Sequence, residues 1–227
     1  TQAMADDLFA VVLSGQVKPN RAVEQLVAQK TTEVQDILQK PIGETLVSMD
    51  NCYAGECALG NLVTDAMLAA NQAGDRPADI AMHNNGGLRA PLAKGPTTYG
   101  ALFNVLPFGN VLAAVDLTGA QVLAVLEKSV SARPGSMHVA GMTFTFDLSK
   151  PVGSRVVSAT VSGQPLDPAR VYRVQTIDYL LTGGDGQTTF AAGTNVVYGD
   201  PCLDVVAAYI KKNSPINPKS EGRIRGN

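Results

Sequence analysis

The sequence predicts an α+β fold in which helices flank a mixed β-sheet. Segments with helical spacing of apolar residues mix with short β-branched runs, but without a strict βαβ alternation. The 227 residues include 22 glycines and 13 prolines, so turns are frequent. A chain of this mass buries about 70% of its unfolded surface, which is enough for one large core with an appendage.

Four segments have the composition and apolar spacing of helices. In the first, Asn20 is a suitable N-cap, and Pro41 cannot continue the helix. Thr118 is the expected cap of the third. The predicted helices are residues 21–40, 60–71, 120–130 and 204–212. Residues 1–19 are ambiguous and receive no assignment.

Short apolar runs bounded by turn-forming residues predict the strands. A Lys-Pro-Val-Gly turn at 150–153 joins two of them, and a glycine cluster at 183–186 ends another. The predicted strands are residues 79–82, 111–117, 142–146, 156–161, 171–177 and 196–198.

Charge and hydropathy exclude several classes of partner. The formal net charge is −2, and the 18 Lys and Arg residues are scattered, so we expect no nucleic-acid partner. No apolar stretch approaches the roughly 20 residues of a membrane helix, so we expect no membrane contact from this segment. The first residues lack the basic and apolar regions of a signal peptide, which is typical of a mature chain or a cut one.

The cysteine spacing leaves three alternatives open. Cys52 and Cys57 are close in sequence, whereas Cys202 is distant. A local disulfide, two free thiols and a metal site all fit a C-x4-C pair. The metal site is the weakest alternative because structural zinc takes four ligands, and no further Cys or His is nearby in the sequence.

Three loops carry side chains suited to binding. The loop at 83–89 offers the amide of Asn84, close backbone approach at Gly86 and the guanidinium of Arg89 for a phosphate or carboxylate. Phe108 lies in a loop and suits stacking on a heterocycle. Tyr179 precedes a glycine loop whose Asp185 suits a sugar diol. The alternatives are ordinary turns with solvated charges, and a core position for Phe108.

Catalytic patterns are absent from the sequence. Its two histidines, His83 and His138, are too few for a dinuclear metal site, and neither lies beside a nucleophile. His83 could donate a hydrogen bond to a ligand, but a polar histidine in a loop is more often solvated, and we expect this of His83. The chain is therefore suited to binding rather than catalysis, with no catalytic residue and no metal ligand assigned.

Six ordered segments resemble the C-terminal domain of 5′-nucleotidases. The similarity covers roughly residues 45 to 225. The segments are 55–67 (GECALGNLVTDAM), 78–89 (ADIAMHNNGGLR), 105–110 (VLPFGN), 117–119 (LTG), 183–186 (GGDG) and 221–224 (EGRI). The resemblance implies a domain at 45–227 that holds the nucleoside, preceded at 1–44 by an extension and an interdomain linker helix.

The resemblance also implies roles for individual residues. Phe108 and Tyr179 would sandwich the base, and Asp185 would bind the ribose hydroxyls. Asn84 would bond the base, and Arg89 would bind phosphate. Cys52 and Cys57 match a pair that is disulfide-bonded in animal members of the family.

The implied activity is that of a larger enzyme. Two divalent metal ions would lie on an N-terminal metallophosphoesterase domain in cis, so this part alone would be inactive. The substrate would be a nucleoside 5′-monophosphate, with adenosine or AMP as ligand. The protein would be extracellular, periplasmic or at the cell surface.

Tyr53 is the main departure from the family pattern. It occupies a position where many members have a phosphate-binding arginine, which weakens the expectation of a monophosphate preference. Two alternatives follow: a related hydrolase acting on UDP-sugars, cyclic nucleotides or another ester, and a non-catalytic binding module.

Overall fold

The computed structural model describes residues 20–71, 76–131 and 135–227. Residues 1–19, which received no assignment from the sequence, lie outside the described part. The chain divides into two compact units, residues 1–37 and 38–227. The boundary expected at 44/45 stays a prediction.

Helix α1 (Arg21–Leu38) makes up most of the described part of the first unit, and its last residue, Leu38, belongs to the second. The Oδ1 of Asn20 accepts hydrogen bonds from the backbone N–H groups of Ala22 and Val23 at 3.0 and 3.3 Å, so the predicted N-cap is confirmed. No residue of this helix is buried, and its large apolar side chains before Leu38 are exposed.

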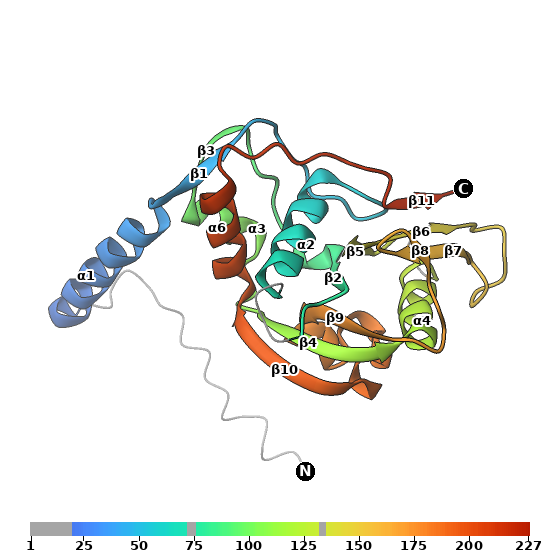
Figure 1. Ribbon diagram of the computed structural model, residues 1–227. Coiled ribbons are helices and arrows are strands. Elements are labelled where there is room, and N and C mark those ends of the chain that lie inside the picture. Colours follow the sequence, from blue (N-terminus) through green and yellow to red (C-terminus); the bar gives the residue numbers. More distant parts are fainter. Residues whose placement is uncertain (1–19, 72–75, 132–134) are drawn as a thin grey trace, which may run out of the picture. The chain divides into compact units, whose positions relative to one another are not determined.

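A five-stranded mixed sheet forms the centre of the second unit (Figure 1). Its strand order is β10-β4-β9-β2-β5. Strands β2 and β9 are parallel, and the other neighbouring pairs are antiparallel. The predicted α+β class with a mixed sheet is confirmed. The strands are β2 (Ile80–Asn84), β4 (Val111–Thr118), β5 (Met137–Ala140), β9 (Val171–Ile177) and β10 (Thr194–Pro201).

Two smaller sheets complete the strands of this unit. A four-stranded sheet has the order β11-β6-β7-β8, and its β6–β7 hairpin confirms two predicted strands. β1 and β3 pair antiparallel. The strands are β1 (Pro41–Thr45), β3 (Gly95–Thr98), β6 (Met142–Phe146), β7 (Val156–Val161), β8 (Gln164–Pro165) and β11 (Ile224–Gly226).

Helices cover the central sheet. α2 packs against β2, β5 and β9, and α6 packs against α2 and β1, whereas α4 and α5 contact β4. Thr118 forms a full capping box with Gln121 at the start of α4, as predicted for the cap. The helices are α2 (Ala58–Asn71), α3 (Tyr99–Val105), α4 (Gly119–Ser129), α5 (Asp178–Leu181) and α6 (Cys202–Asn213).

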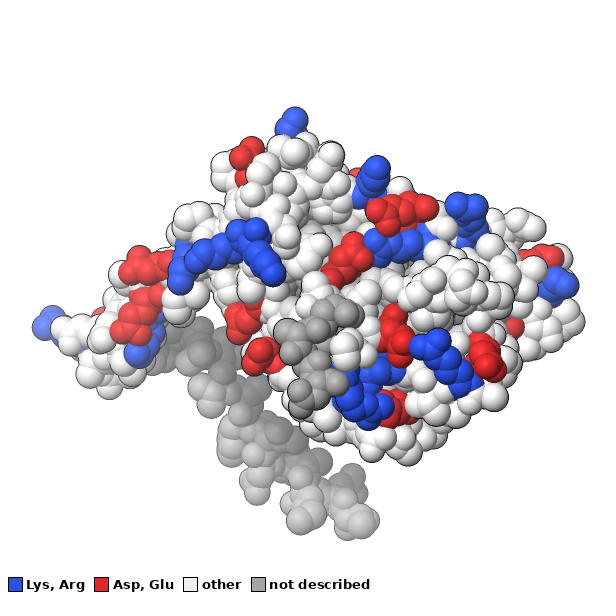
Figure 2. All heavy atoms as spheres, in the orientation of Figure 1, with Lys and Arg blue, Asp and Glu red and all other residues white. Residues whose placement is uncertain are grey.

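Charged side chains do not gather by sign on the face that Figure 2 shows. Lysine and arginine are interspersed there with aspartate and glutamate. No helix among the described residues is long and apolar enough to cross a membrane.

Candidate functional site

The candidate site forms at one edge of the central sheet. β2 and β9 run parallel, so their carboxyl ends lie at the same edge. β4 runs antiparallel to β9 and pairs Leu112 with Ile177, so the start of β4 lies there too. The loop before β4, the end of β2 and the segment after β9 therefore converge at this edge, although they are far apart in sequence.

The carboxylate of Asp185 joins two of these segments. Its Oδ2 accepts a hydrogen bond of 2.7 Å from the Nδ2 of Asn84, and its Oδ1 accepts one of 2.9 Å from the hydroxyl of Tyr179. The backbone N–H of Asp185 donates to the same tyrosine oxygen at 3.2 Å. The bond to Asp185 raises the pKa of Tyr179. The carboxylate is thus oriented while the residue stays exposed.

The glycine loop has a local reason to adopt this shape. Asp185 has φ of 54°, in the left-handed region that aspartate tolerates better than most residues. Gly184 lies against the ring of Tyr179, and a Cβ there would approach the ring to 2.5 Å. A side chain at this position would have to displace the ring, and with it the tyrosine hydroxyl that reaches the carboxylate.

Arg89 and Phe108 form a second pair at the same edge. The guanidinium carbon of Arg89 lies 5.8 Å from the centroid of the Phe108 ring, within cation–π range, and its Nη1 donates to the carbonyl of Gly86 at 3.3 Å. Among the described residues, no carboxylate lies within ion-pair distance of Arg89. Phe108 is 59% exposed and Tyr179 43% exposed. The alternative of a core position for Phe108 is therefore wrong.

A cavity of about 320 Å³ adjoins Asp185. Tyr53, Asn85, Gly86, Lys128, Asp185 and Gln187 lie along its wall. Gln187 is 3% exposed, and its Oε1 has no hydrogen-bond partner among the described residues. The structure therefore brings Tyr53, Gly86 and Asp185 together, three residues proposed from sequence.

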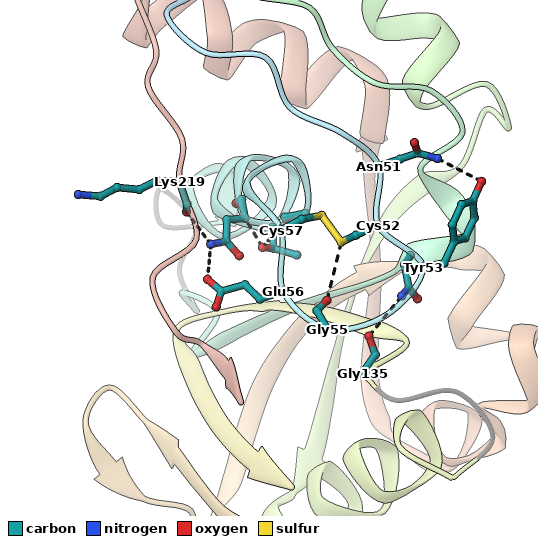
Figure 3. Close-up of a disulfide and its surroundings, with 12 residues drawn as sticks. Asn51, Cys52, Tyr53, Gly55, Glu56, Cys57, Gly135 and Lys219 are labelled. Carbon is teal, nitrogen blue, oxygen red and sulfur yellow. Dashed lines mark hydrogen bonds between the residues drawn. A yellow bond between two sulfur atoms is a disulfide. The ribbon is translucent and has the colours of Figure 1, made fainter. Parts of the chain in front are cut away.

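The loop that carries Tyr53 is closed by a disulfide between Cys52 and Cys57 (Figure 3). The hydroxyl of Tyr53 accepts a hydrogen bond of 3.1 Å from Asn51, and the N–H of Gly55 donates to the carbonyl of Gly135 at 3.1 Å. The disulfide alternative is the one present, as the resemblance implied. The covalent link and these bonds hold the Tyr53 loop beside the cavity.

The expectation of a solvated His83 is wrong. His83 lies in β2, is 1% exposed and contacts the carbonyl of Asn84 through its Nδ1 at 2.8 Å. Burial lowers its pKa to about 4. The strand continues to Asn84, past the predicted end at residue 82, and this extension moves His83 from the loop into the core.

A dinuclear hydrolase centre does not fit the described residues. The one cluster of potential ligands found among them is Cys52, Cys57 and His138, and no group of Asp and His side chains comes together. A dinuclear site needs several such ligands.

A second cavity, of about 660 Å³, was not predicted from the sequence. Arg76, Arg173, Tyr198 and Asp200 contribute to its wall. Arg76, Arg173 and the pair on β10 are far apart in the sequence, so no local sequence pattern predicts that they line one cavity. Its buried guanidinium, that of Arg173, pairs with Asp116 at 3.0 Å, and the exposed Arg76 pairs with the same carboxylate at 2.8 Å.

The fold is of the α+β class, and exposed polar and aromatic side chains meet at one edge of its central sheet. A family model described as "5′-nucleotidase, C-terminal domain" matches residues 30–192. The chain belongs to this family.

Relatives in several organisms support this. The chain is 32% identical over 242 residues to the "Trifunctional nucleotide phosphoesterase protein YfkN" of Bacillus subtilis, covering 99% of this chain and 16% of that protein. It is 30% identical over 243 residues to "Snake venom 5′-nucleotidase" of Macrovipera lebetinus, covering 94% and 59%. The chain therefore spans less than two thirds of the length of these relatives.

A solved structure agrees in fold. The 5′-nucleotidase precursor from Thermus thermophilus superimposes with a TM-score of 0.81 at 34% identity, covering 91% of this chain and 43% of that one. The resemblance inferred from the six segments is confirmed at the level of family and fold. The family includes 5′-nucleotidase-type hydrolases.

Proposed function

We propose that this chain is the nucleoside-recognition domain of a 5′-nucleotidase that hydrolyses nucleoside 5′-monophosphates to nucleoside and phosphate. The observation that carries the proposal is the oriented, exposed carboxylate of Asp185, held by Asn84 and Tyr179 beside an exposed ring. A fixed carboxylate can accept hydrogen bonds from ribose hydroxyls, as acidic residues do in dinucleotide-binding folds.

The remaining roles follow from chemistry. Phe108 and Tyr179 offer ring faces to the base, and Arg89, which has no carboxylate partner among the described residues, offers its guanidinium to the phosphate. Asn84 orients Asp185 through its amide nitrogen, and its Oδ1 has no hydrogen-bond partner in the described part of the chain. That oxygen is buried and Asn84 is 4% exposed, so the contact with the base that the resemblance implies for Asn84 requires this oxygen to become accessible when the ligand binds.

The hydrolytic step belongs to a different part of the enzyme. We propose an N-terminal metallophosphoesterase domain in cis, whose two divalent metal ions activate the attacking water. This chain's own residues bind and orient the nucleotide, and they provide no base or nucleophile for the reaction. We also propose an extracellular, periplasmic or cell-surface location, supported by the disulfide and by the venom relative.

One observation favours a second candidate, a related hydrolase of larger nucleotides such as UDP-sugars. The cavity beside Asp185 has room for an additional group, and Tyr53 lies on its wall where an arginine is common in the family. Comparison of UDP-glucose with AMP as ligands distinguishes the two candidates, because only the former fills that cavity.

The test is calorimetric titration of the chain with adenosine and AMP, beside Phe108→Ala. Stacking contributes about 1–3 kcal/mol per base, and association has a large entropic cost, so we expect adenosine to bind with a Kd of about 1 mM. AMP should bind only slightly more tightly than adenosine if Tyr53 replaces a phosphate contact. Saturable heat that Phe108→Ala abolishes supports the proposal, whereas equal binding by both proteins refutes the aromatic site.

A further inference from the structure

His138 has an unusual environment. It lies in β5, is fully buried, and both of its ring nitrogens lack a hydrogen-bond partner among the described residues. Buried polar atoms in native proteins are almost always paired, and an unpaired one calls for an explanation, such as local strain, a bound water or ion, or a redox role.

The fold makes room for this ring. It packs against Gly60 near the start of α2, where a Cβ would collide with the Nδ1 of the imidazole. Across the strand pair, His138 is opposite His83. The ring is therefore enclosed by α2 on one side and by the central sheet on the other.

Two sulfur atoms complete the surroundings. One ligand atom of His138 and the Sγ atoms of Cys52 and Cys57 all lie within 4.8 Å of one another. Spacing alone argued against a metal here because the sequence places no histidine near the cysteines. The tertiary fold brings His138 from β5 to the two cysteines, so the folded chain does place a histidine beside them.

We propose that, when the disulfide is reduced, Cys52, Cys57 and His138 bind Zn²⁺ through two thiolates and one imidazole nitrogen, leaving the fourth position to water. Zinc prefers this donor set, and sites with two cysteines, one histidine and an open position occur in enzymes. Both cysteines are partly exposed, which gives the metal a path to the buried ring.

A dithiol can reduce the disulfide between Cys52 and Cys57. The dithiol gives two electrons and two protons to the S–S bond and becomes a disulfide itself, which leaves two cysteine thiols. Zn²⁺ then displaces one proton from each thiol. Burial, with the nearby His83, lowers the pKa of His138 to about 3, so its imidazole is neutral, the form that binds metals.

Zinc would then replace the disulfide as the cross-link of the loop that carries Tyr53 (Figure 3). The wall of the cavity beside Asp185 would keep its place under both oxidising and reducing conditions. The zinc site itself stands whether or not that cavity binds a nucleotide.

The experiment compares zinc binding by the oxidised and the reduced chain. A phosphine reduces the disulfide, taking an oxygen from water to become the phosphine oxide, and is removed without air. Zn²⁺ is titrated against a chromophoric chelator, and Co²⁺ is used as a spectroscopic substitute. We expect one zinc per reduced chain, none per oxidised chain, and a thiolate-to-cobalt charge-transfer band.

Variants assign the ligands. Cys57→Ser and His138→Leu should each weaken zinc binding by more than about 100-fold, since even indirect partners of a metal contribute 10–100-fold. Cys202→Ser is the matched control, because this buried cysteine lies outside the cluster and should leave binding unchanged.

A readout on the wild-type chain guards against variants that fail to fold. Zn²⁺ should slow the alkylation of Cys52 and Cys57 in the reduced chain, as followed by mass spectrometry. The proposal is overturned if reduction adds no zinc binding, if alkylation is unaffected by zinc, or if a folded His138→Leu variant gives the wild-type affinity.

Discussion

Replacement of Asp116 by alanine should destabilise the domain strongly. Asp116 lies on β4 directly across from Arg173 on β9, and the two residues are 4% and 8% exposed. The carboxylate accepts hydrogen bonds from Arg173 at 3.0 Å, from Arg76 at 2.8 Å and from Asn195 at 2.7 Å. Asp116→Ala therefore removes the counter-charge of a buried guanidinium.

The magnitude follows from what remains around Arg173. Its Nη1 still donates to the carbonyl of Asn195 at 2.6 Å, but the positive charge has lost its carboxylate. Breaking a buried pair in this way costs about 3–5 kcal/mol. Arg76→Ala is the matched control: it removes a bond to the same carboxylate, but the Arg76 side chain is 57% exposed, so the cost is about 1 kcal/mol or less.

Urea denaturation followed by circular dichroism measures both variants against the wild type. Asp116 is at the end of β4 away from the Asp185 edge, so adenosine binding by the folded fraction should be unchanged. Equal losses of stability in Asp116→Ala and Arg76→Ala, or a loss below about 1 kcal/mol in the former, would refute the reasoning from burial.

Two further predictions concern the site and the buried histidines. Tyr179→Phe keeps the ring but loses the bond to Asp185, so the Kd of adenosine in an NMR titration should rise by about threefold to tenfold, matching one hydrogen bond of about 1 kcal/mol; an unchanged Kd contradicts the role of the hydroxyl. Burial lowers the pKa values of His83 and His138 to about 4 and 3, so the unfolded chain binds more protons below pH 6.5. Stability is therefore full above about pH 6.5 and falls toward pH 4, by up to about 2.7 kcal/mol per pH unit for the two groups. A histidine resonance of the folded chain that titrates near pH 6.5 would contradict this.

Local sequence signals predicted the elements that depend on local interactions. The Asn20 and Thr118 caps and the β6–β7 hairpin are set by neighbours in sequence, and the structure confirms them. The sequence did not predict the short strands β1, β3 and β11. Each has only three to five residues and contains glycine or proline, and its partner strand is distant in sequence.

For the candidate site, the sequence predicted which residues take part, whereas the fold decided which of them are in contact. Its candidate residues, among them Asn84, Phe108 and Asp185, were predicted from residue chemistry and from the family resemblance, and their binding roles stay proposals. Which of them touch was decided by the strand order, because the parallel pairing of β2 with β9 brings Asn84 to Asp185.

The sequence by itself determined the fold class, the caps, the family and the set of loops that could bind a ligand. Only the tertiary structure buried His83 and brought His138 to the two cysteines. The physical reason is that propensity, capping and turn chemistry act over a few residues, whereas burial and the meeting of distant side chains depend on how strands pair across the whole chain.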